Sequence, residues 1–359
     1  MVKAAFEVRA LTRDFGDVRG EAASCRSAAA LFDFSFMSRL RIEGPGACAL
    51  IAKLTTRRID DLVAGRIRYA LRVDAAGRVR GDLTIWRLDS ERFEVFSGIG
   101  DELAELQAAA GSTASVHDLS TDSAILALQG PASLQALAVV SEVEPLRALP
   151  YFAHMGSSIA GVPCRIGRLG YTGERGFEIV LPRVEREAIW TILARHARPA
   201  GFAAADLLRI EAGFLLFANE LRFPVSSAEL GLERFAPELG HERVSRAGER
   251  RVRLLCFRAA GACEPVLWQP SQSGTPFPPP PGTTAVTSAC RSILDGDVLG
   301  LGYALAAPSP PNLVDAAGQF HDLCEVSLPF YDPGKRRPRG GWRDDLLPEG
   351  GPSFIRPMM

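Results

Sequence analysis

The sequence predicts an α+β body of two intertwined lobes, followed by a smaller all-β domain. The chain has 359 residues, which suggests two or three compact units rather than a single core. In its first part, strand-like segments of alternating apolar and polar residues are interspersed with helical stretches. Around residues 247–250 the composition shifts, and the remainder is strand-like and rich in proline. We therefore place the body at residues 1–246, the all-β domain at 247–333 and a tail at 334–359.

Most elements of the body follow from hydrophobic periodicity and turn residues. Residues 66–73 and 79–86 alternate on either side of a turn and predict a β-hairpin. The most regular helix is predicted from about 184 to 198, because Pro199 and Gly201 end it. The remaining predictions are helices at 47–54, 101–110, 132–140 and 204–214, and strands at 92–97, 123–128, 164–169 and 177–181.

The C-terminal part carries two features besides its strands. The proline run at 276–281 is interpreted as an exposed loop between two strands rather than as an SH3-type ligand. The basic segment at 335–339 is interpreted as a solvated terminus.

Composition argues against several classes of protein. Lys+Arg 41 against Asp+Glu 42 gives a net charge of −1, so no global field attracts nucleic acid or an anionic membrane. No stretch approaches the ~18 apolar residues of a membrane span, and the charged N-terminus shows no secretory signal. The seven cysteines are odd in number and contain no C-x-x-C pair, which predicts reduced thiols rather than disulfides or a metal site. We therefore expect a cytoplasmic protein that binds no metal, nucleic acid or membrane.

Two carboxylates are expected on strands, with their side chains directed away from a core. On the strand at 79–86, Asp82 shares a face with Arg80, since side chains alternate between the two faces. From these residues alone, Asp82 is expected on a solvated face, paired with Arg80. Glu178 follows Phe177, which points into a core, so Glu178 is likewise expected on an exposed strand face.

Several short segments follow one another in an order and spacing that together are specific. The strongest is GYTGERGFEI at 170–179, and the segment ALQGP lies before it at 127–131. They are accompanied by LFDFSFM at 31–37, DLLRIEAG at 206–213 and strand-like segments at 286–290, 301–303 and 326–330. On these segments the chain resembles the aminomethyltransferase superfamily, the glycine cleavage T-protein family, over about residues 30–335.

The resemblance implies a fold, a cofactor and a reaction. The fold is two intertwined α+β lobes with a C-terminal β-barrel domain, and the cofactor is tetrahydrofolate. The reaction is the transfer of a methyl or aminomethyl carbon onto a folate nitrogen. A small one-carbon donor is then a partner, a lipoyl carrier protein is a candidate partner, and the chain is expected to be a monomer or a weak dimer.

The resemblance also assigns roles to five residues. Asp82 falls where the family keeps its catalytic aspartate, and Tyr69 falls on its folate-contacting tyrosine. Glu178 corresponds to the glutamate that accepts the adjacent N–H pair of the pterin ring. Tyr171 is expected to stack on the same ligand or to hydrogen-bond to it. Arg209 is predicted as a further folate contact.

Four positions depart from the family pattern. They are Phe36 for an early histidine, Gly98 for an asparagine at a strand end, Ala205 for an arginine, and Gly81 for the first of two paired aspartates. Ala205 is interpreted as the loss of a cationic folate contact, and Phe36 as a core residue. These departures predict that the one-carbon donor is not the aminomethyl-lipoyl arm of ordinary glycine cleavage. The chain also lacks the K-G-C-x-x-G-Q-E segment of the family branch that assembles iron–sulfur clusters.

Three functions are compatible with this pattern. Asp82 favours an enzyme, a tetrahydrofolate-dependent transferase or demethylase that stabilises a cationic one-carbon centre. Gly98 and Ala205 favour a non-catalytic folate-binding protein, or a scaffold of the same family that binds another ligand or a protein partner.

Overall fold

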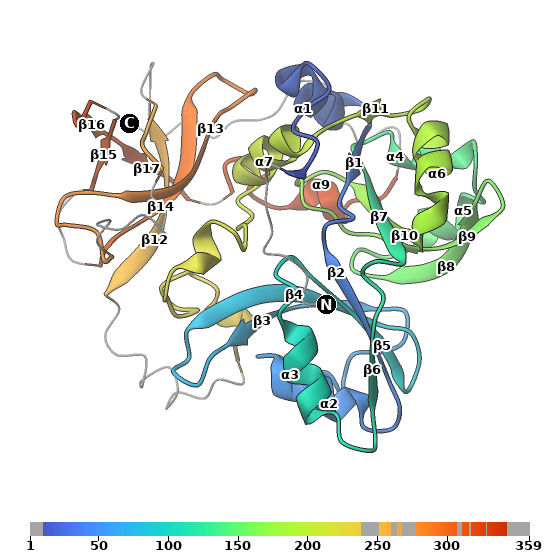
Figure 1. Cartoon of the computed structure of the whole chain (residues 1–359). Coiled ribbons are helices and arrows are strands. Elements are labelled where there is room, and N and C mark those ends of the chain that lie inside the picture. The colour runs from blue at the N-terminus through green and yellow to red at the C-terminus, as the bar shows by residue number, and fades with distance from the viewer. Residues whose placement is uncertain are drawn as a thin grey trace.

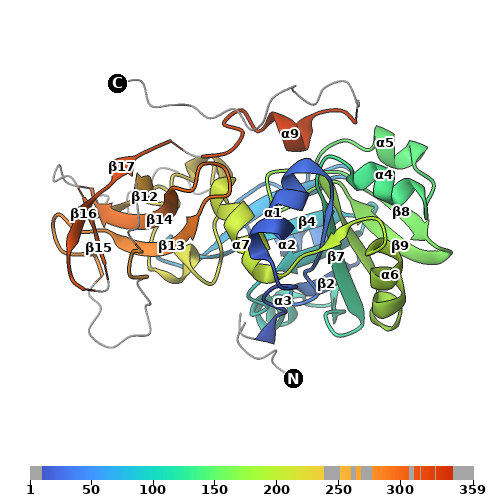
Figure 2. The same cartoon turned by 90° about the horizontal axis from the view of Figure 1, so that it is seen from above.

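The computed structural model describes residues 10–237, 251–259, 264–267, 277–306, 311–315, 317–327 and 329–342. Figure 1 shows two lobes, one above the other, with a separate β region at their side. Figure 2 shows the β region beside the lobes from above, with the short helix α9 (Arg336–Arg339) near the end of the chain. None of the described helices is long and apolar enough to cross a membrane.

The lower lobe in Figure 1 is a five-stranded antiparallel sheet with two helices packed on it. Its strands, in the order β3-β4-β5-β2-β6, are β2 (Ser38–Glu43), β3 (Ile67–Val73), β4 (Val79–Arg87), β5 (Arg92–Ser97) and β6 (Ser115–Asp118). The helices are α2 (Ala47–Leu54) and α3 (Glu102–Ala109). In α2, Leu50, Ile51 and Leu54 recur at helical spacing and pack on the sheet. β3 and β4 are the hairpin that the sequence predicts.

The upper lobe is a six-stranded sheet in the order β11-β1-β7-β10-β9-β8. Its strands are β1 (Ala30–Asp33), β7 (Ser123–Gln129), β8 (His154–Ile159), β9 (Val162–Gly167), β10 (Gly176–Pro182) and β11 (Arg198–Pro199). Its helices are α1 (Val18–Ser27), α4 (Ser133–Ala138), α5 (Glu144–Ala148), α6 (Arg186–Leu193) and α7 (Phe202–Glu211). The lobes are intertwined because β1 and β2 are consecutive in the chain but belong to different sheets. The helix predicted from 184 to 198 is shorter than expected, since α6 ends at Leu193.

The C-terminal strands form an open sheet rather than the predicted barrel. Its strands, in the order β13-β14-β12-β17, are β12 (Val252–Ala259), β13 (Ala285–Arg291), β14 (Val298–Leu305) and β17 (Cys324–Glu325). β15 (Asn312–Val314) and β16 (Phe320–Asp322) form a separate ladder. Within the described residues the outer strands β13 and β17 do not pair with each other, so the sheet does not close. The body packs on it instead, because Ile210 of α7 contacts Leu299 and Leu301 of β14.

Two predictions for this region fall wholly or partly outside the described residues. The predicted domain boundary at 246/247 lies outside them. The described part of the proline run, from Phe277 onward, lies between β12 and β13. It is not wholly exposed, since the Phe277 ring packs against Phe223 and Tyr303.

The start of the predicted tail packs on the body and is not a solvated terminus. Arg147 and Arg168 donate hydrogen bonds to the backbone carbonyls of Trp342 and Gly340 respectively. The Trp342 ring stacks on Phe177 with its centroid 5.0 Å away, and it is only 5% exposed. The basic residues expected in water therefore belong to a segment that is fastened to the upper lobe. Residues 343–359 of the predicted tail lie outside the described part of the chain.

Trp342→Ala should lower the free energy of unfolding by about 3 kcal/mol, since it removes a buried ring and its stacking contact. Phe320→Ala is the matched control, because Phe320 is 64% exposed and its loss should cost less than about 0.5 kcal/mol. Urea unfolding followed by circular dichroism measures both variants. Equal stability of the Trp342→Ala variant and the wild type would contradict the packing of this segment.

Candidate functional site

The β3–β4 hairpin brings Tyr69 and Asp82 together. In the register of the hairpin, Tyr69 lies opposite Thr84. Thr84 is two residues from Asp82 on β4, so Tyr69 and Asp82 share one face of the sheet. Asp82 is therefore a diagonal neighbour that a long side chain can reach. The Tyr69 hydroxyl donates a 3.0 Å hydrogen bond to Oδ2 of Asp82. Arg80, which the sequence pairs with Asp82, instead lies 3.8 Å from a carboxylate oxygen of Asp101.

Asp82 is half-buried and has no cationic partner among the described residues. Burial raises the pKa of its carboxyl to about 6; the hydrogen bond from Tyr69 opposes this rise and the charge of Glu220 adds to it. Among the described residues, no arginine or lysine forms an ion pair with Asp82. A carboxyl with this pKa is mostly ionised at neutral pH and can take up a proton in weak acid. The site therefore holds an oriented, poorly solvated anion.

The ring of Tyr171 lies near the same carboxylate. Burial raises the pKa of both Tyr69 and Tyr171, and the charge of Asp82 adds to the rise at both. The Tyr171 hydroxyl donates a 2.5 Å hydrogen bond to the carbonyl of Leu215. Its ring stacks on Phe214 with 5.8 Å between centroids. Because the hydroxyl is engaged with the backbone, Tyr171 offers a ligand its ring rather than a proton.

β10 places Glu178 on the face of the upper sheet that meets the lower lobe. Its neighbour Phe177 points into the core of the upper lobe. Val180, on the same face as Glu178, packs in a cluster with Trp86 of β4. Trp86 shares its strand face with Asp82, since the two are four residues apart on β4. The two carboxylates therefore lie on sheet faces that converge between the lobes.

Glu178 has hydrogen-bonding capacity that the protein leaves unused. Burial raises the pKa of its carboxyl to about 7, and no hydrogen bond or ion pair to it is found in the described part of the chain. Burial raises the pKa of Tyr151 to about 12, and the charge of Glu178 adds to this rise. Tyr151 therefore lies near Glu178. Desolvated carboxylates without partners are costly, so Glu178 is suited to accept donors from a ligand.

Arg209 does not line this space. Its side chain is 0% exposed and lies 2.8 Å from Asp206 and 3.1 Å from Glu220. It also donates to the Ser288 hydroxyl at 2.6 Å and to the carbonyl of Phe214 at 3.1 Å. These bonds join α7 to β13 and to the loop that follows α7. The Arg209 side chain is therefore engaged by groups of the protein, and its role as a folate contact stays a prediction.

Apolar side chains cover two of the glycines that the sequence singles out. A Cβ added at Gly98 would lie 2.0 Å from the Phe217 ring, and one at Gly81 would lie 2.6 Å from Cδ1 of Ile99. A larger side chain at either position would require the apolar group above it to shift, which glycine avoids. The sequence does not predict Phe217 or Ile99 as site residues. The available signal is the glycine itself, which in a strand often marks close approach of another group.

Of the other two departures, Ala205 is buried and Phe36 is half-buried. Ala205 is 0% exposed and packs in the cluster between the lobes. It lies in the same cluster as Trp86 and Val180, and its interpretation as a lost cationic contact stays a prediction. Phe36 packs edge-on against Phe34 and Phe202, each with centroids 5.9 Å away, which agrees with the predicted core role.

The described residues contain no candidate metal centre. No group of three or more His, Cys, Asp or Glu side chains among them is placed to hold a metal ion. The cysteines within the described ranges are unpaired thiols, and Cys263 lies outside those ranges.

Comparison with known proteins finds similarity along most of the chain. Residues 5–237 match the model of the family described as the GCVT N-terminal domain. The aminomethyltransferase of Streptomyces avermitilis is 31% identical over 341 residues, covering 88% of this chain and 90% of that protein. That of Moorella thermoacetica is 36% identical over 219 residues, covering 58% and 60% of the two chains. The crystal structure of the glycine cleavage system aminomethyltransferase T from Bartonella henselae aligns with a TM-score of 0.72 at 26% identity, covering 88% and 90%.

Glu178→Gln should flatten the dependence of stability on pH. Folding raises the pKa of Glu178 from its ordinary value of 4.5 to about 7, so the folded state favours the protonated form. The resulting stabilisation is fully present below about pH 4.5 and is lost as the pH rises to about 7. The variant should therefore gain stability relative to the wild type across this interval.

Calorimetric melting temperatures between pH 4.5 and 8 measure this difference. Glu144→Gln, at a side chain that is 78% exposed, is the control and should follow the wild type. Parallel curves for Glu178→Gln and the wild type would show that Glu178 is solvated rather than buried.

Gly98→Asn should destabilise the protein by about 1–3 kcal/mol, since the new side chain must displace the Phe217 ring. Gly156→Asn is the control, because a Cβ at Gly156 meets nothing within 4 Å. The double variant Gly98→Asn with Phe217→Ala should be less destabilised than the sum of its single changes. Denaturant titration of the four proteins tests the coupling, and strict additivity would contradict the contact.

Proposed function

The chain belongs to the glycine cleavage T-protein family, the aminomethyltransferases, and on this premise we propose that it is a tetrahydrofolate-dependent one-carbon transferase. The observation that carries the proposal is the pair of desolvated carboxylates, Asp82 and Glu178, on converging sheet faces between the lobes. The similarity to aminomethyltransferases over about nine tenths of their length supports the reaction class.

Tetrahydrofolate, which the family implies, fits the residues present. A pterin ring presents adjacent N–H donors on its pyrimidine edge, and a carboxylate accepts such a pair in a bidentate manner. Glu178 provides this acceptor, because its carboxyl is desolvated and has no partner among the described residues. The flat rings of Tyr171 and Tyr69 lie near Asp82 and offer stacking surfaces. We therefore assign Glu178 and the two tyrosines to folate binding.

Asp82 would supply the electrostatic part of catalysis. Bound tetrahydrofolate contributes the nitrogen that accepts the carbon. Beside it, the Asp82 carboxylate would stabilise the positive charge that develops on the transferring centre. The hydrogen bond from Tyr69 fixes Oδ2 before reaction, and the desolvated surroundings strengthen the interaction with a cation. No rearrangement of the protein is needed to create this negative charge.

The one-carbon donor is inferred to differ from the aminomethyl-lipoyl arm of ordinary glycine cleavage. Ile99 and Phe217 cover Gly81 and Gly98, where the family pattern has polar side chains. This surface is consequently more apolar than the family pattern predicts, and we infer from it a small donor molecule. A lipoyl carrier protein remains a candidate partner and belongs in any screen of donors.

A non-catalytic folate-binding protein is the alternative. It is favoured by the same two glycines, since they remove polar groups that could orient a donor. It predicts folate binding without turnover, so a kinetic test separates the two functions.

Asp82→Asn keeps the volume of the side chain and removes its charge. If Asp82 stabilises the transition state, this variant should bind tetrahydrofolate within a few-fold of the wild type and lose turnover by about 10²–10³-fold. Isothermal titration and a donor screen (aminomethyl, dimethylglycine, sulfonium and aryl methyl ether compounds) measure the two quantities. Asp60→Asn, at a side chain that is 64% exposed, is the control. Full turnover in Asp82→Asn would refute the role of Asp82, and no turnover by the wild type with any donor would favour the binding protein.

A further inference from the structure

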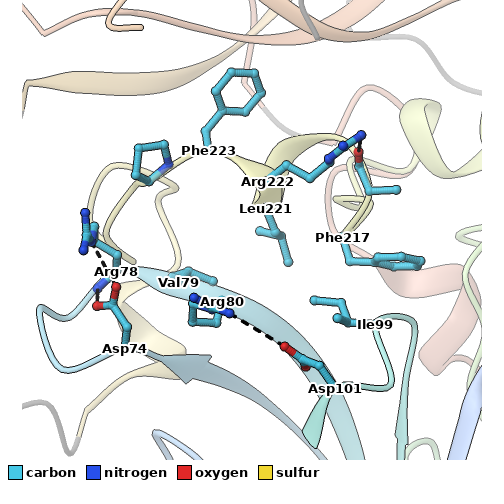
Figure 3. Close-up of a pocket in the computed structure, with 12 residues that line it drawn as sticks. Asp74, Arg78, Val79, Arg80, Ile99, Asp101, Phe217, Leu221, Arg222 and Phe223 are labelled. Carbon is cyan, nitrogen blue, oxygen red and sulfur yellow. Dashed lines mark hydrogen bonds and ion pairs between the residues drawn. The ribbon is translucent and has the colours of Figure 1, made fainter. Parts of the chain in front are cut away.

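A cavity of about 570 Å³ lies between the turn of the β3–β4 hairpin and the segment 217–224. Asp82, Glu178 and their tyrosine neighbours do not line it, so it is separate from the folate site proposed above. Its size is within the range of pockets that hold small organic molecules. Figure 3 shows charged groups around its rim and apolar groups toward one end.

The apolar end is formed by Ile99, Phe217 and Leu221; in Figure 3 Leu221 points toward Ile99, and the Phe217 ring extends away from Leu221. Two of these side chains are held in place from beneath. Phe217 rests on Gly98, and Ile99 rests on Gly81. The wall is therefore fixed by close contact with the backbone, and its shape does not depend on a ligand.

The rim carries more positive than negative charge. Arg78 is paired with Asp74 at 3.0 Å, and Arg80 lies 3.8 Å from Asp101. Arg222 has no carboxylate within ion-pair distance in the described part of the chain, and it donates only a 3.4 Å hydrogen bond to a backbone carbonyl. The three arginines and two aspartates of the lining leave one net positive charge. Arg222 has no carboxylate partner among the described residues, and Arg80 shares Asp101 with Arg72.

We propose that this cavity binds a small organic monocarboxylate, with the carboxylate on Arg222 and the apolar body against Ile99, Phe217 and Leu221. A guanidinium group matches the two oxygens of a carboxylate. One uncompensated charge suits a monoanion, whereas a phosphate dianion would also meet the repulsion of Asp74 and Asp101. An anion as small as acetate should bind more weakly, because it would not contact the apolar wall.

Three probes separate the parts of this recognition. Benzoate carries both the charge and the apolar body, benzyl alcohol carries the body without the charge, and acetate carries the charge without the body. Saturation-transfer NMR titrations should give saturable binding of benzoate, with benzyl alcohol and acetate at least about tenfold weaker.

Three variants locate the site. Arg222→Gln should weaken benzoate binding about tenfold or more, since it removes a charge-assisted hydrogen bond. Ala218→Phe should abolish binding by filling the cavity that Ala218 lines. Arg195→Gln is the control, because Arg195 is exposed on the turn after α6, and it should bind benzoate as the wild type does. Melting curves verify that each variant folds.

The proposal fails if benzoate does not saturate, if benzyl alcohol binds as tightly as benzoate, or if Arg222→Gln leaves the affinity unchanged. It also fails if tetrahydrofolate displaces benzoate competitively, because the cavity would then belong to the folate site. Tetrahydrofolate titrations of Arg222→Gln and Ala218→Phe should match the wild type. If tetrahydrofolate binds to none of the proteins while benzoate still binds to the wild type, the proposed function is refuted and the proposal for this cavity is supported.

Discussion

The placement of the candidate site depends on the buried ion pair between Arg209 and Glu220. Both side chains are 0% exposed, and their charged atoms are 3.1 Å apart. Arg209 also binds the carbonyl of Phe214, and Glu220 accepts from the amide of Leu216. The pair therefore fixes the loop after α7, whose Phe214 ring stacks on Tyr171. Removing one partner from such a pair leaves the other charge buried without a partner, which lowers the free energy of unfolding by about 3–5 kcal/mol. The position of the loop, and with it that of Tyr171, therefore depends on this ion pair.

The contrast between compensated and uncompensated carboxylates distinguishes the site from the rest of the interior. Glu94 is fully buried with Arg39 at 2.6 Å, and Glu211 is fully buried with Arg26 at 2.9 Å. Asp82 and Glu178 are desolvated without such partners, which raises the pKa of both. Carboxylates with pKa values raised in this way are often found where a ligand or a reaction uses them. Arginines neutralise Glu94 and Glu211, whereas the described residues provide no cation for Asp82 or Glu178.

The sequence predicts what depends on short-range pattern and misses what depends on distant contacts. The alternation on both sides of one turn is enough to predict the β3–β4 hairpin, and with it the neighbourhood of Tyr69 and Asp82. The pattern cannot show that β13 leaves its sheet open, because Ile210 of a distant helix covers that sheet. It likewise cannot show that Trp342 stacks on Phe177, since the two lie in segments far apart in the chain.

The site residues follow the same division. Strand periodicity predicts that Asp82 and Glu178 point away from the core, while their roles in the site come from the resemblance and stay predictions. Arg209 is assigned from a local motif, which does not record that its partner Ser288 comes from another domain of the fold. Ile99 and Phe217 are missed because only the glycines beneath them are visible in the sequence.

A crystal structure with tetrahydrofolate bound tests the central claim most directly. The account predicts the pyrimidine edge of the pterin within about 2.6–3.2 Å of the Glu178 oxygens, and the reacting nitrogens beside Asp82. A complex in which the ligand contacts neither carboxylate would contradict it.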